Sequence, residues 1–339
     1  MHAPPPKRID PKESPLMQFE KSVLVPLGAD ETFALITEPD RLRRWHTIAA
    51  RVDLRAGGDY RWTIVPGHSA SGTFNEVEAG KRVVFTWGWE GQADLPPGAS
   101  TVTITLEPAG DGTIVRLVHD GLTDEQAASH GQGWTHYLDR LVQAGASGEA
   151  GPDEWVAAPQ QLDAIKSAEA TLASCQLVLR GIPAASYQNA TCCTEFTVSQ
   201  VAEHLIGSIT FIGGTADAEF PQTAATTLEA RVAAAGQPAL EAWNRRGLDG
   251  TVKVGPNEMP AGLALGILSV ELLVHAWDFA RATGQQVSVS DELAGYVLEI
   301  AQTIITPEVR GRGSFASEVP AGPDAGILDR LVAFTGRAA

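Results

Sequence analysis

Residues 260–283 combine an apolar helical pattern with three side chains that can bind a metal ion or hold a proton. Glu271, His275 and Asp278 stand at i, i+4 and i+7, so a helix places all three on one face. The residues before Glu271 are nearly all apolar, and a buried ionised carboxylate is costly unless a positive group meets it. Two ligand-type residues one turn apart can hold one metal ion, so the spacing indicates a metal site.

A third ligand is expected from a neighbouring helix. Residues 197–200 read TVSQ, a capping-box pattern that begins a helix, and His204 adjoins the apolar stripe that follows. His204, Glu271 and His275 would leave positions open for water or substrate, as in a catalytic metal site. Two imidazoles and one carboxylate suit zinc, with iron, nickel or manganese as alternatives. From spacing alone, exposed polar residues on a helix explain the same pattern.

The composition limits the classes of function. The chain has 339 residues, of which 44% are hydrophobic, and a formal net charge of −16, which indicates a globular protein of two domains. The negative charge repels phosphate backbones and anionic membranes, so we expect no nucleic-acid and no membrane partner. The longest apolar run, residues 261–274, is short and contains Glu271, which argues against a membrane span. Three cysteines and an N-terminus unlike a signal peptide favour a cytoplasmic location.

Two kinds of residue pattern divide the chain. Alternating polar and apolar runs indicate strands in the first part, and helical spacing dominates after residue 160. The strands are expected at residues 19–25, 59–65, 82–87, 101–106 and 113–118, and early helices at 30–35 and 133–144. Later helices are expected at residues 162–179, 198–212, 226–235, 261–283 and 291–305. The predicted domains are residues 17–146 and 160–339, joined by a linker, residues 147–159, that begins with small and breaker-rich sequence.

Several motifs of the first part occur in a fixed order. They read PLGADETFALITEP at 26–39, LRRW at 42–45, DLRAGGDY at 53–60, GTFNEV at 72–77, VFTW at 84–87 and GW at 133–134. Together they resemble the SRPBCC (START-like, helix-grip) superfamily, in the branch named after the chaperone-ATPase activator. The resemblance covers residues 17–146 and implies an α+β fold, in which a curved antiparallel sheet wraps a long helix around a cavity. It does not imply that this chain stimulates a chaperone.

Aromatic side chains are the candidates for lining such a cavity. The predicted pocket for a small apolar ligand comprises Trp45, Trp62, Trp87, Trp89, Trp134, His68 and His136. His46 is a further polar candidate. Plain core packing explains the same tryptophans, because large aromatic residues dominate protein cores. The first part shows no nucleophile–base pair that sequence alone supports.

The second part carries a different resemblance. Its motifs read CTEFTV at 193–198, EHLIG at 203–207, ELLVHAWDFARATG at 271–284 and LDRLVAFTGR at 328–337. Over residues 160–339 they resemble the DinB-like superfamily, in particular the N-terminal domain of mycothiol-dependent maleylpyruvate isomerase. The resemblance implies an all-α four-helix bundle that binds a divalent metal through His204, Glu271 and His275, with the metal activating the thiol mycothiol. Asp278 is expected to orient a ligand or a helix partner, and pairing with an N–H group or Arg281 on the helix surface is the alternative. Cys193 is expected to be a buried thiol, with a place near the metal as the alternative.

These patterns favour one function over two alternatives. We expect a metal-dependent enzyme, a thiol-dependent transferase or isomerase, in which zinc activates a mycothiol-like thiol or water for attack on an apolar electrophile. The isomerase has an additional C-terminal domain, whereas this chain has a START-like domain in front, so the isomerase substrate is not carried over. The alternatives are a small-molecule-binding or stress-response protein with a structural metal, and a regulatory protein that binds a partner.

Overall fold

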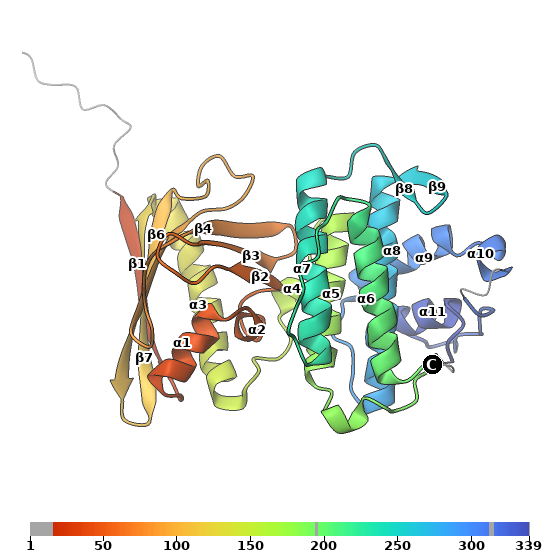
Figure 1. The fold of residues 1–339 in the computed structure, drawn as a ribbon, viewed down its shortest axis with the longest axis horizontal. Helices are drawn as coiled ribbons and strands as arrows, with labels where there is room; N and C mark the ends of the chain where they lie inside the picture. The colour runs from red at the N-terminus through yellow and green to blue at the C-terminus, as the bar shows by residue number, and fades with distance from the viewer. Residues whose placement is uncertain (1–15, 194–195, 312–314, 339) are drawn as a thin grey trace, which may run out of the picture. The chain divides into compact units, whose positions relative to one another are not determined.

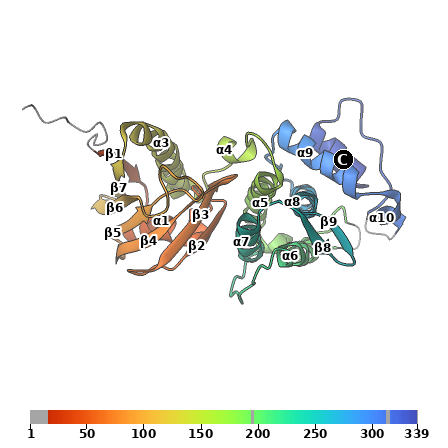
Figure 2. The same cartoon turned by 90° about the horizontal axis from the view of Figure 1, so that it is seen from above.

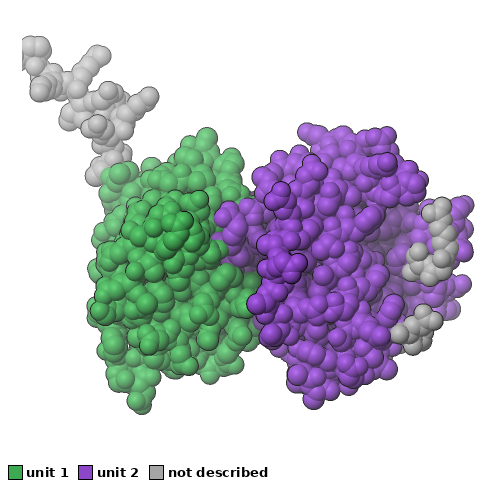
Figure 3. Space-filling model, viewed as in Figure 1, with its two compact units in different colours: residues 1–46, 52–61, 70–150 green, residues 47–51, 62–69, 151–339 purple. Residues whose placement is uncertain are grey.

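The computed structural model describes residues 16–193, 196–311 and 315–338. They form two compact units: the first includes residues up to 46, 52–61 and 70–150, and the second includes residues 47–51, 62–69 and those from 151 onward (Figure 3). The division between residues 150 and 151 falls inside the predicted linker, which also contains the short helix α4 (Glu154–Ala157). That the two parts fold independently stays a prediction.

A seven-stranded sheet has the strand order β1-β7-β6-β5-β4-β3-β2 (Figure 1). Along this order, the pairs from β1 to β4 are antiparallel. The strands are β1 (Met17–Val25), β2 (Ala49–Val52), β3 (Asp59–Val65), β4 (His68–Glu78), β5 (Arg82–Trp87), β6 (Ser100–Ala109) and β7 (Gly112–Leu122). All five predicted strands lie in it. The two that were not predicted are the four-residue β2 and β4, whose first half is rich in serine and contains Gly72.

One long helix packs against this sheet. Helix α3 (Asp124–Ser147) packs against β1 and β7, while α1 (Ala29–Thr37) and the short α2 (Pro39–Leu42) follow the first strand. A capping box between Thr123 and Gln126 begins α3, and Gly148, with a left-handed φ of 84°, ends it. Helix α3 begins well before residue 133, where the apolar spacing predicted its start. Its first turns are polar, so the apolar spacing misses them, and the capping box sets the true start. The antiparallel sheet and its long helix confirm the predicted α+β helix-grip fold.

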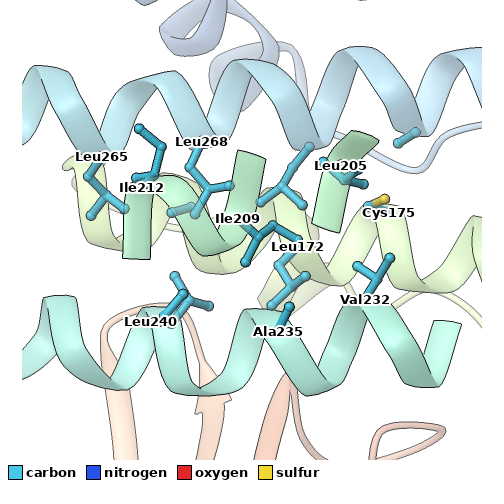
Figure 4. Close-up of a cluster of buried hydrophobic side chains, with 14 of the residues drawn as sticks. Leu172, Cys175, Leu205, Ile209, Ile212, Val232, Ala235, Leu240, Leu265 and Leu268 are labelled. Carbon is cyan, nitrogen blue, oxygen red and sulfur yellow. The ribbon is translucent and has the colours of Figure 1, made fainter. Parts of the chain in front are cut away.

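Four helices of the second unit surround one apolar core. They are α5 (Ala164–Arg180), α6 (Val198–Gly214), α7 (Leu228–Arg246) and α8 (Ala261–Thr283), and Figure 2 shows all four nearly end-on. Helices α5 and α6 each pack against α7 and α8. Figure 4 shows the shared core, to which the four helices contribute Leu172, Cys175, Leu205, Ile209, Val232, Leu240, Leu265 and Leu268. Membership of the DinB-like superfamily stays a prediction.

The remaining elements follow these helices or connect them. They are the 3₁₀ helix η1 (Ala184–Ser186), the hairpin of β8 (Thr251–Val254) and β9 (Asn257–Pro260), and the helices α9 (Asp291–Ile304), α10 (Pro307–Gly311) and α11 (Ile327–Phe334). Helix α11 packs on α9 and α8 through a second apolar cluster that includes Leu331, Leu293 and Leu273. This packing brings the segment after α11, with Arg337, to the side of α8.

Helix α8 is the one helix of the described residues that is long and apolar enough to cross a membrane by length and composition. In its most apolar window, 83% of the residues are buried inside the protein. Such burial is what the central helix of a globular core also shows.

The first prediction concerns the start of α6, the helix that carries His204. Thr197 Oγ1 accepts a hydrogen bond from the Gln200 backbone N–H, and Gln200 Oε1 accepts one from the Thr197 backbone N–H. Thr197→Ala should lower the free energy of unfolding by about 1 kcal/mol, because it leaves a helix N–H group without its cap. Gln200→Ala, which removes the reciprocal bond, should cost less. Urea unfolding of both variants measures this, and an unchanged Thr197→Ala protein would contradict it.

Candidate functional site

Helices α6 and α8 bring three predicted metal ligands together. His204 Nε2 lies 3.1 Å from Glu271 Oε2, and His275 Nε2 lies 3.7 Å from the same oxygen. Ser208, one turn after His204 on α6, donates a hydrogen bond to Glu271 Oε2 at 2.8 Å. The two imidazole rings are close to perpendicular, with centroids 5.2 Å apart.

The spacing of these ligand atoms suits a metal ion. One ligand atom from each of His204, Glu271 and His275 lies within 4.8 Å of the other two. Ligands bound to zinc at about 2.1 Å in a tetrahedron are about 3.4 Å apart, which is close to the two distances to Glu271. Two imidazole nitrogens and a carboxylate oxygen are also a donor set that zinc and related divalent metals accept. The residues present therefore fit the metal that their resemblance implies.

The three ligands differ in exposure. The side chain of His275 is 7% exposed and that of Glu271 is 16% exposed, whereas that of His204 is 46% exposed. Solvent therefore reaches the three residues mainly from the side of His204. The ring of Phe196 lies beside His204 on this side, with centroids 6.2 Å apart and planes 15° from parallel.

The fully buried carboxylate of Asp278 contacts the Nδ1 side of the His275 ring. Asp278 Oδ2 lies 2.8 Å from His275 Nδ1. Arg337 donates two hydrogen bonds to Asp278, one to each oxygen, both at 2.8 Å. Cys193 Sγ lies 3.3 Å from Asp278 Oδ2 and 3.1 Å from Arg337 Nη2. The contact of Asp278 with His275 is compatible with a role in orienting a ligand, which stays a prediction; Cys193, expected to be a buried thiol, is only partly buried and lies beside Asp278.

Hydrogen bonds control the charges of these groups. Burial alone would raise the pKa of Glu271, but hydrogen bonds from His204, His275 and Ser208 outweigh it and lower the pKa far below its ordinary value. Burial would lower the pKa of His275, but its bonds with Asp278, Cys193 and Glu271 raise it well above the ordinary value. Burial also opposes ionisation of Asp278, and there the bonds from His275 and Arg337 prevail and lower its pKa.

A charge count follows from these ionisation states. Glu271 and Asp278 contribute two negative charges, and Arg337 contributes one positive charge. The proton that the raised pKa of His275 indicates balances the remaining negative charge, so these largely buried groups carry no unpaired charge. A metal cation beside Glu271 could take the place of that proton.

In the first unit, three of the predicted pocket tryptophans form one aromatic cluster. The Trp87 ring centroid lies 5.1 Å from that of Trp134 and 5.4 Å from that of Trp89. Two histidines complete the cluster: His119 and His130 have ring centroids 5.0 Å apart in an edge-to-face arrangement. Trp87 and Trp134 are buried, and Trp89 is partly exposed.

Hydrogen bonds fix the protonation of both cluster histidines. Trp134 Nε1–H, a pure donor, points to His119 Nδ1 at 3.0 Å, so the neutral ring carries its proton on Nε2 and donates to Ser100 Oγ at 2.8 Å. Ser100 in turn donates to the Trp87 carbonyl at 3.1 Å. In the same way, Trp89 donates to His130 Nε2 at 3.1 Å, and His130 Nδ1 donates to the Gln126 carbonyl at 2.8 Å. Burial lowers the pKa of His119 to about 3.

Of the other predicted pocket residues, Trp45 is linked to this cluster through His46. Trp45 is buried and stacks on the buried His46, with ring centroids 4.9 Å apart, and the His46 ring lies 5.6 Å from that of Trp134. Trp62 is buried and His68 is exposed. His136 lines an apolar surface groove of about 570 Å³ between α3 and β1, together with residues that include Phe19, Ala128 and Gly131. Sequence reasoning therefore grouped into one pocket residues that the structure places in a core cluster and in a separate surface groove.

Four important residues were not predicted as site residues: Ser208, Arg337, His119 and His130. Ser208 stands one turn after His204, so helical spacing from a predicted ligand would have indicated it. Arg337 lies 59 residues from Asp278 in sequence, and the buried charge of Asp278 was the signal that a cation had to be found. His119 directly follows the predicted strand 113–118, and extending the alternation of that strand by one residue would have placed it in the core.

Comparisons with known proteins agree with the fold of the first unit. Residues 27–146 match the family model described as Activator of Hsp90 ATPase homolog 1-like protein. An AHSA1-like protein of Rhizobium etli, solved by NMR, is 32% identical over 41% of this chain and 88% of its own, with a TM-score of 0.33. The Aha1 dimer of Colwellia psychrerythraea is 17% identical over 39% of this chain and 98% of its own, with a TM-score of 0.35.

A mycobacterial relative is also similar to this chain. It is an uncharacterized protein of Mycobacterium tuberculosis, named Rv0738 in strain H37Rv and MT0763 in strain CDC 1551. The two sequences are 34% identical over 150 residues, which cover 43% of this chain and 82% of the relative.

The neutral state of His119 predicts a pH dependence of stability. Unfolded His119 takes up a proton below about pH 6.5, whereas the folded residue resists protonation down to about pH 3. The unfolded state then binds more protons, so stability falls as the pH drops through this window, by up to about 1.4 kcal/mol per pH unit. His119→Gln keeps an acceptor and a donor but does not titrate, so its stability should depend less on pH. Tryptophan fluorescence during urea unfolding measures both proteins, and equal pH dependence would contradict the prediction.

The buried Asp278–Arg337 pair predicts a large loss of stability when one partner is removed. Arg337→Ala leaves Asp278, which is 0% exposed, without its guanidinium, and should lower the free energy of unfolding by about 3 kcal/mol or more. Arg330→Ala is the matched control, because Arg330 lies on α11 and its recorded bond is an exposed one to the Ala325 carbonyl. Urea unfolding followed by circular dichroism compares them, and similar losses in the two variants would refute the role of the pair.

Proposed function

We propose that this chain, whose residues 27–146 match the Activator of Hsp90 ATPase homolog 1-like family model, is a two-part, metal-dependent enzyme acting on an apolar small molecule. In this proposal the second unit binds a divalent metal, most simply zinc. A low-molecular-weight thiol of the mycothiol type, or water, is the nucleophile. The first unit, with its helix-grip fold, collects the apolar substrate.

One observation carries the proposal: His204, Glu271 and His275 converge from two helices with ligand atoms within 4.8 Å of one another. Their open side leads to solvent through His204, so a small molecule can approach. The positive charge that Glu271 and Asp278 attract to His275 is one that a bound cation could replace, which is compatible with a metal site. The resemblance of residues 160–339 to the DinB-like superfamily points in the same direction.

The chain's own residues have definable tasks. His204, Glu271 and His275 would hold the metal, which when bound lowers the pKa of a thiol or water ligand and so supplies a nucleophile at neutral pH. Asp278 accepts the Nδ1 proton of His275, and this leaves Nε2 directed at Glu271 for ligation. Arg337 keeps Asp278 ionised and in place. Ser208 fixes the Glu271 carboxylate with a hydrogen bond.

A second candidate function is that of a non-enzymatic protein that binds a small apolar ligand, with a structural metal in the second unit. The observation that favours it is the groove beside Phe19, Gly131 and His136, whose lining is mostly apolar and whose volume of about 570 Å³ suits a small molecule. The third candidate is a regulatory protein that binds a partner, and only the name of the matched family supports it. Consumption of a thiol by the purified chain with an electrophile separates the first candidate from the other two.

Glu271→Gln is the sharpest test of the metal site. The change keeps the shape of the side chain but replaces a carboxylate with a neutral amide, a poorer ligand, so metal affinity should fall about a hundredfold. Glu203→Gln is the matched control, because Glu203 adjoins His204 on α6 but faces Arg231 in an exposed ion pair. Elemental analysis measures metal content, and melting temperatures are compared with and without a chelator.

The expected result is a wild type whose melting temperature falls when the chelator is added, and a Glu271→Gln protein that no longer responds to it. The Glu203→Gln control should behave like the wild type. A wild type that never contains metal, or a Glu271→Gln protein that keeps its full content, ends the metal hypothesis. The thiol-activation mechanism would end with it.

A further inference from the structure

An exposed apolar strip adjoins the open side of the predicted metal ligands. It consists of Phe196, His204, Gly207 and Phe211, and this set is called the strip below. Phe211 is 53% exposed and Phe196 is 41% exposed, and both are among the few large apolar side chains of the described residues that are so exposed. Single exposed apolar residues are ordinary, but two exposed aromatic residues, one stacked beside a ligand imidazole and one two turns further along the same helix face, are a more specific arrangement.

Helical geometry aligns the strip on α6. His204, Gly207 and Phe211 stand at i, i+3 and i+7 and are all exposed, so they form one face of the helix. Seven residues of helix span about 10.5 Å, which is more than the length of a phenyl ring with a one-carbon arm, so such a group fits within the strip. Phe196, in the loop before α6, lies at the other end, with its ring stacked beside His204.

The middle of the strip is open. A Cβ placed on Gly207 would meet no atom within 4 Å apart from its own helix backbone and chain neighbours. No packing constraint therefore requires glycine there, although glycine in a helix costs about 0.5–1 kcal/mol relative to alanine. A side chain at this position would stand between the two phenylalanine rings. Glycine keeps that space free beside His204.

We propose that the strip is a specificity site for an aromatic or similarly planar apolar group. The group belongs to the molecule whose sulfur or oxygen meets His204, Glu271 and His275, and it lies over Gly207 between Phe196 and Phe211. Apolar burial and ring stacking then favour aryl-bearing thiols over small polar ones. The inference rests on the proposed function for the position of the reactive atom, but the strip itself can be tested without a metal.

The main experiment uses the full chain loaded with cobalt(II) and two thiols as probes. Benzyl mercaptan carries a phenyl ring, and 2-mercaptoethanol does not. Their binding is followed by the absorption band that a thiolate gives when it coordinates cobalt, a signal that needs no turnover. The wild type should bind benzyl mercaptan about tenfold more tightly, which corresponds to the burial of roughly 55 Å² of apolar surface.

Variants of the strip should remove this preference while the metal stays bound. Phe211→Ala and Gly207→Gln should each bring the affinity for benzyl mercaptan to within about twofold of that for 2-mercaptoethanol. Neither change should unfold α6, because alanine and glutamine both favour a helix more than the residues they replace. Leu24→Ala, at another exposed apolar residue, and Gly133→Gln, at another open helical glycine, are the matched controls. They should keep the wild-type preference.

A second measurement separates the strip from the metal. Benzyl alcohol, which has the ring but no thiol, is titrated into the metal-free chain while backbone amide shifts are recorded by NMR. Shifts at residues 196, 207 and 211 that disappear in Phe211→Ala support the strip even if no metal binds. No shifts there, or a cobalt protein without a preference for benzyl mercaptan, overturn the strip. A chain that binds no cobalt overturns the proposed function instead.

Discussion

The second unit depends on one carboxylate that has no contact with water. Asp278 meets His275 from its own helix, Arg337 from the segment after α11 and Cys193 from the loop before α6. Three segments that are distant in sequence are thereby tied to one point on α8. Because a lone buried charge is so unfavourable, each partner is needed for the others to stay in place. The orientation of His275, and through it the predicted ligand set, depends on this point.

The two units hold their histidines in opposite ways. In the first unit, tryptophan N–H groups donate to His119 and His130, and these bonds together with burial favour neutral rings of one defined tautomer. In the second unit, carboxylates meet His275 and favour either a proton or a cation on the ring. A neutral, hydrogen-bonded imidazole among aromatic rings serves packing, whereas an imidazole between two carboxylates is prepared for charge. This contrast places the candidate chemistry in the second unit.

Sequence reasoning predicted which helices and strands form better than it predicted where they begin and end, or which residues distant in sequence contact one another. Helix α8 was predicted with its observed bounds, because its helical pattern continues without a breaking residue from Ala261 to Thr283 and ends at Gly284. Helix α7 was expected to end at residue 235, since Gly236 and Pro238 are helix-breaking signals, yet burial of Leu240 and Trp243 carries it on to Arg246. Spacing indicated His204, Glu271 and His275 because helices repeat locally. Arg337 could not be found in this way, since nothing local links it to Asp278.

The sequence distance of these partners also affects how the chain folds during synthesis. Cys193 and Asp278 leave the ribosome before Arg337, which follows Cys193 by 144 residues and Asp278 by 59. Until Arg337 arrives, the four helices can gather their apolar core, but the carboxylate within it lacks its guanidinium. Contacts between residues so far apart form late and slowly. We therefore expect a stage of synthesis in which the apolar residues of α8 are already packed but Asp278 still lacks Arg337, and in which chaperones and proteases have access to the second unit.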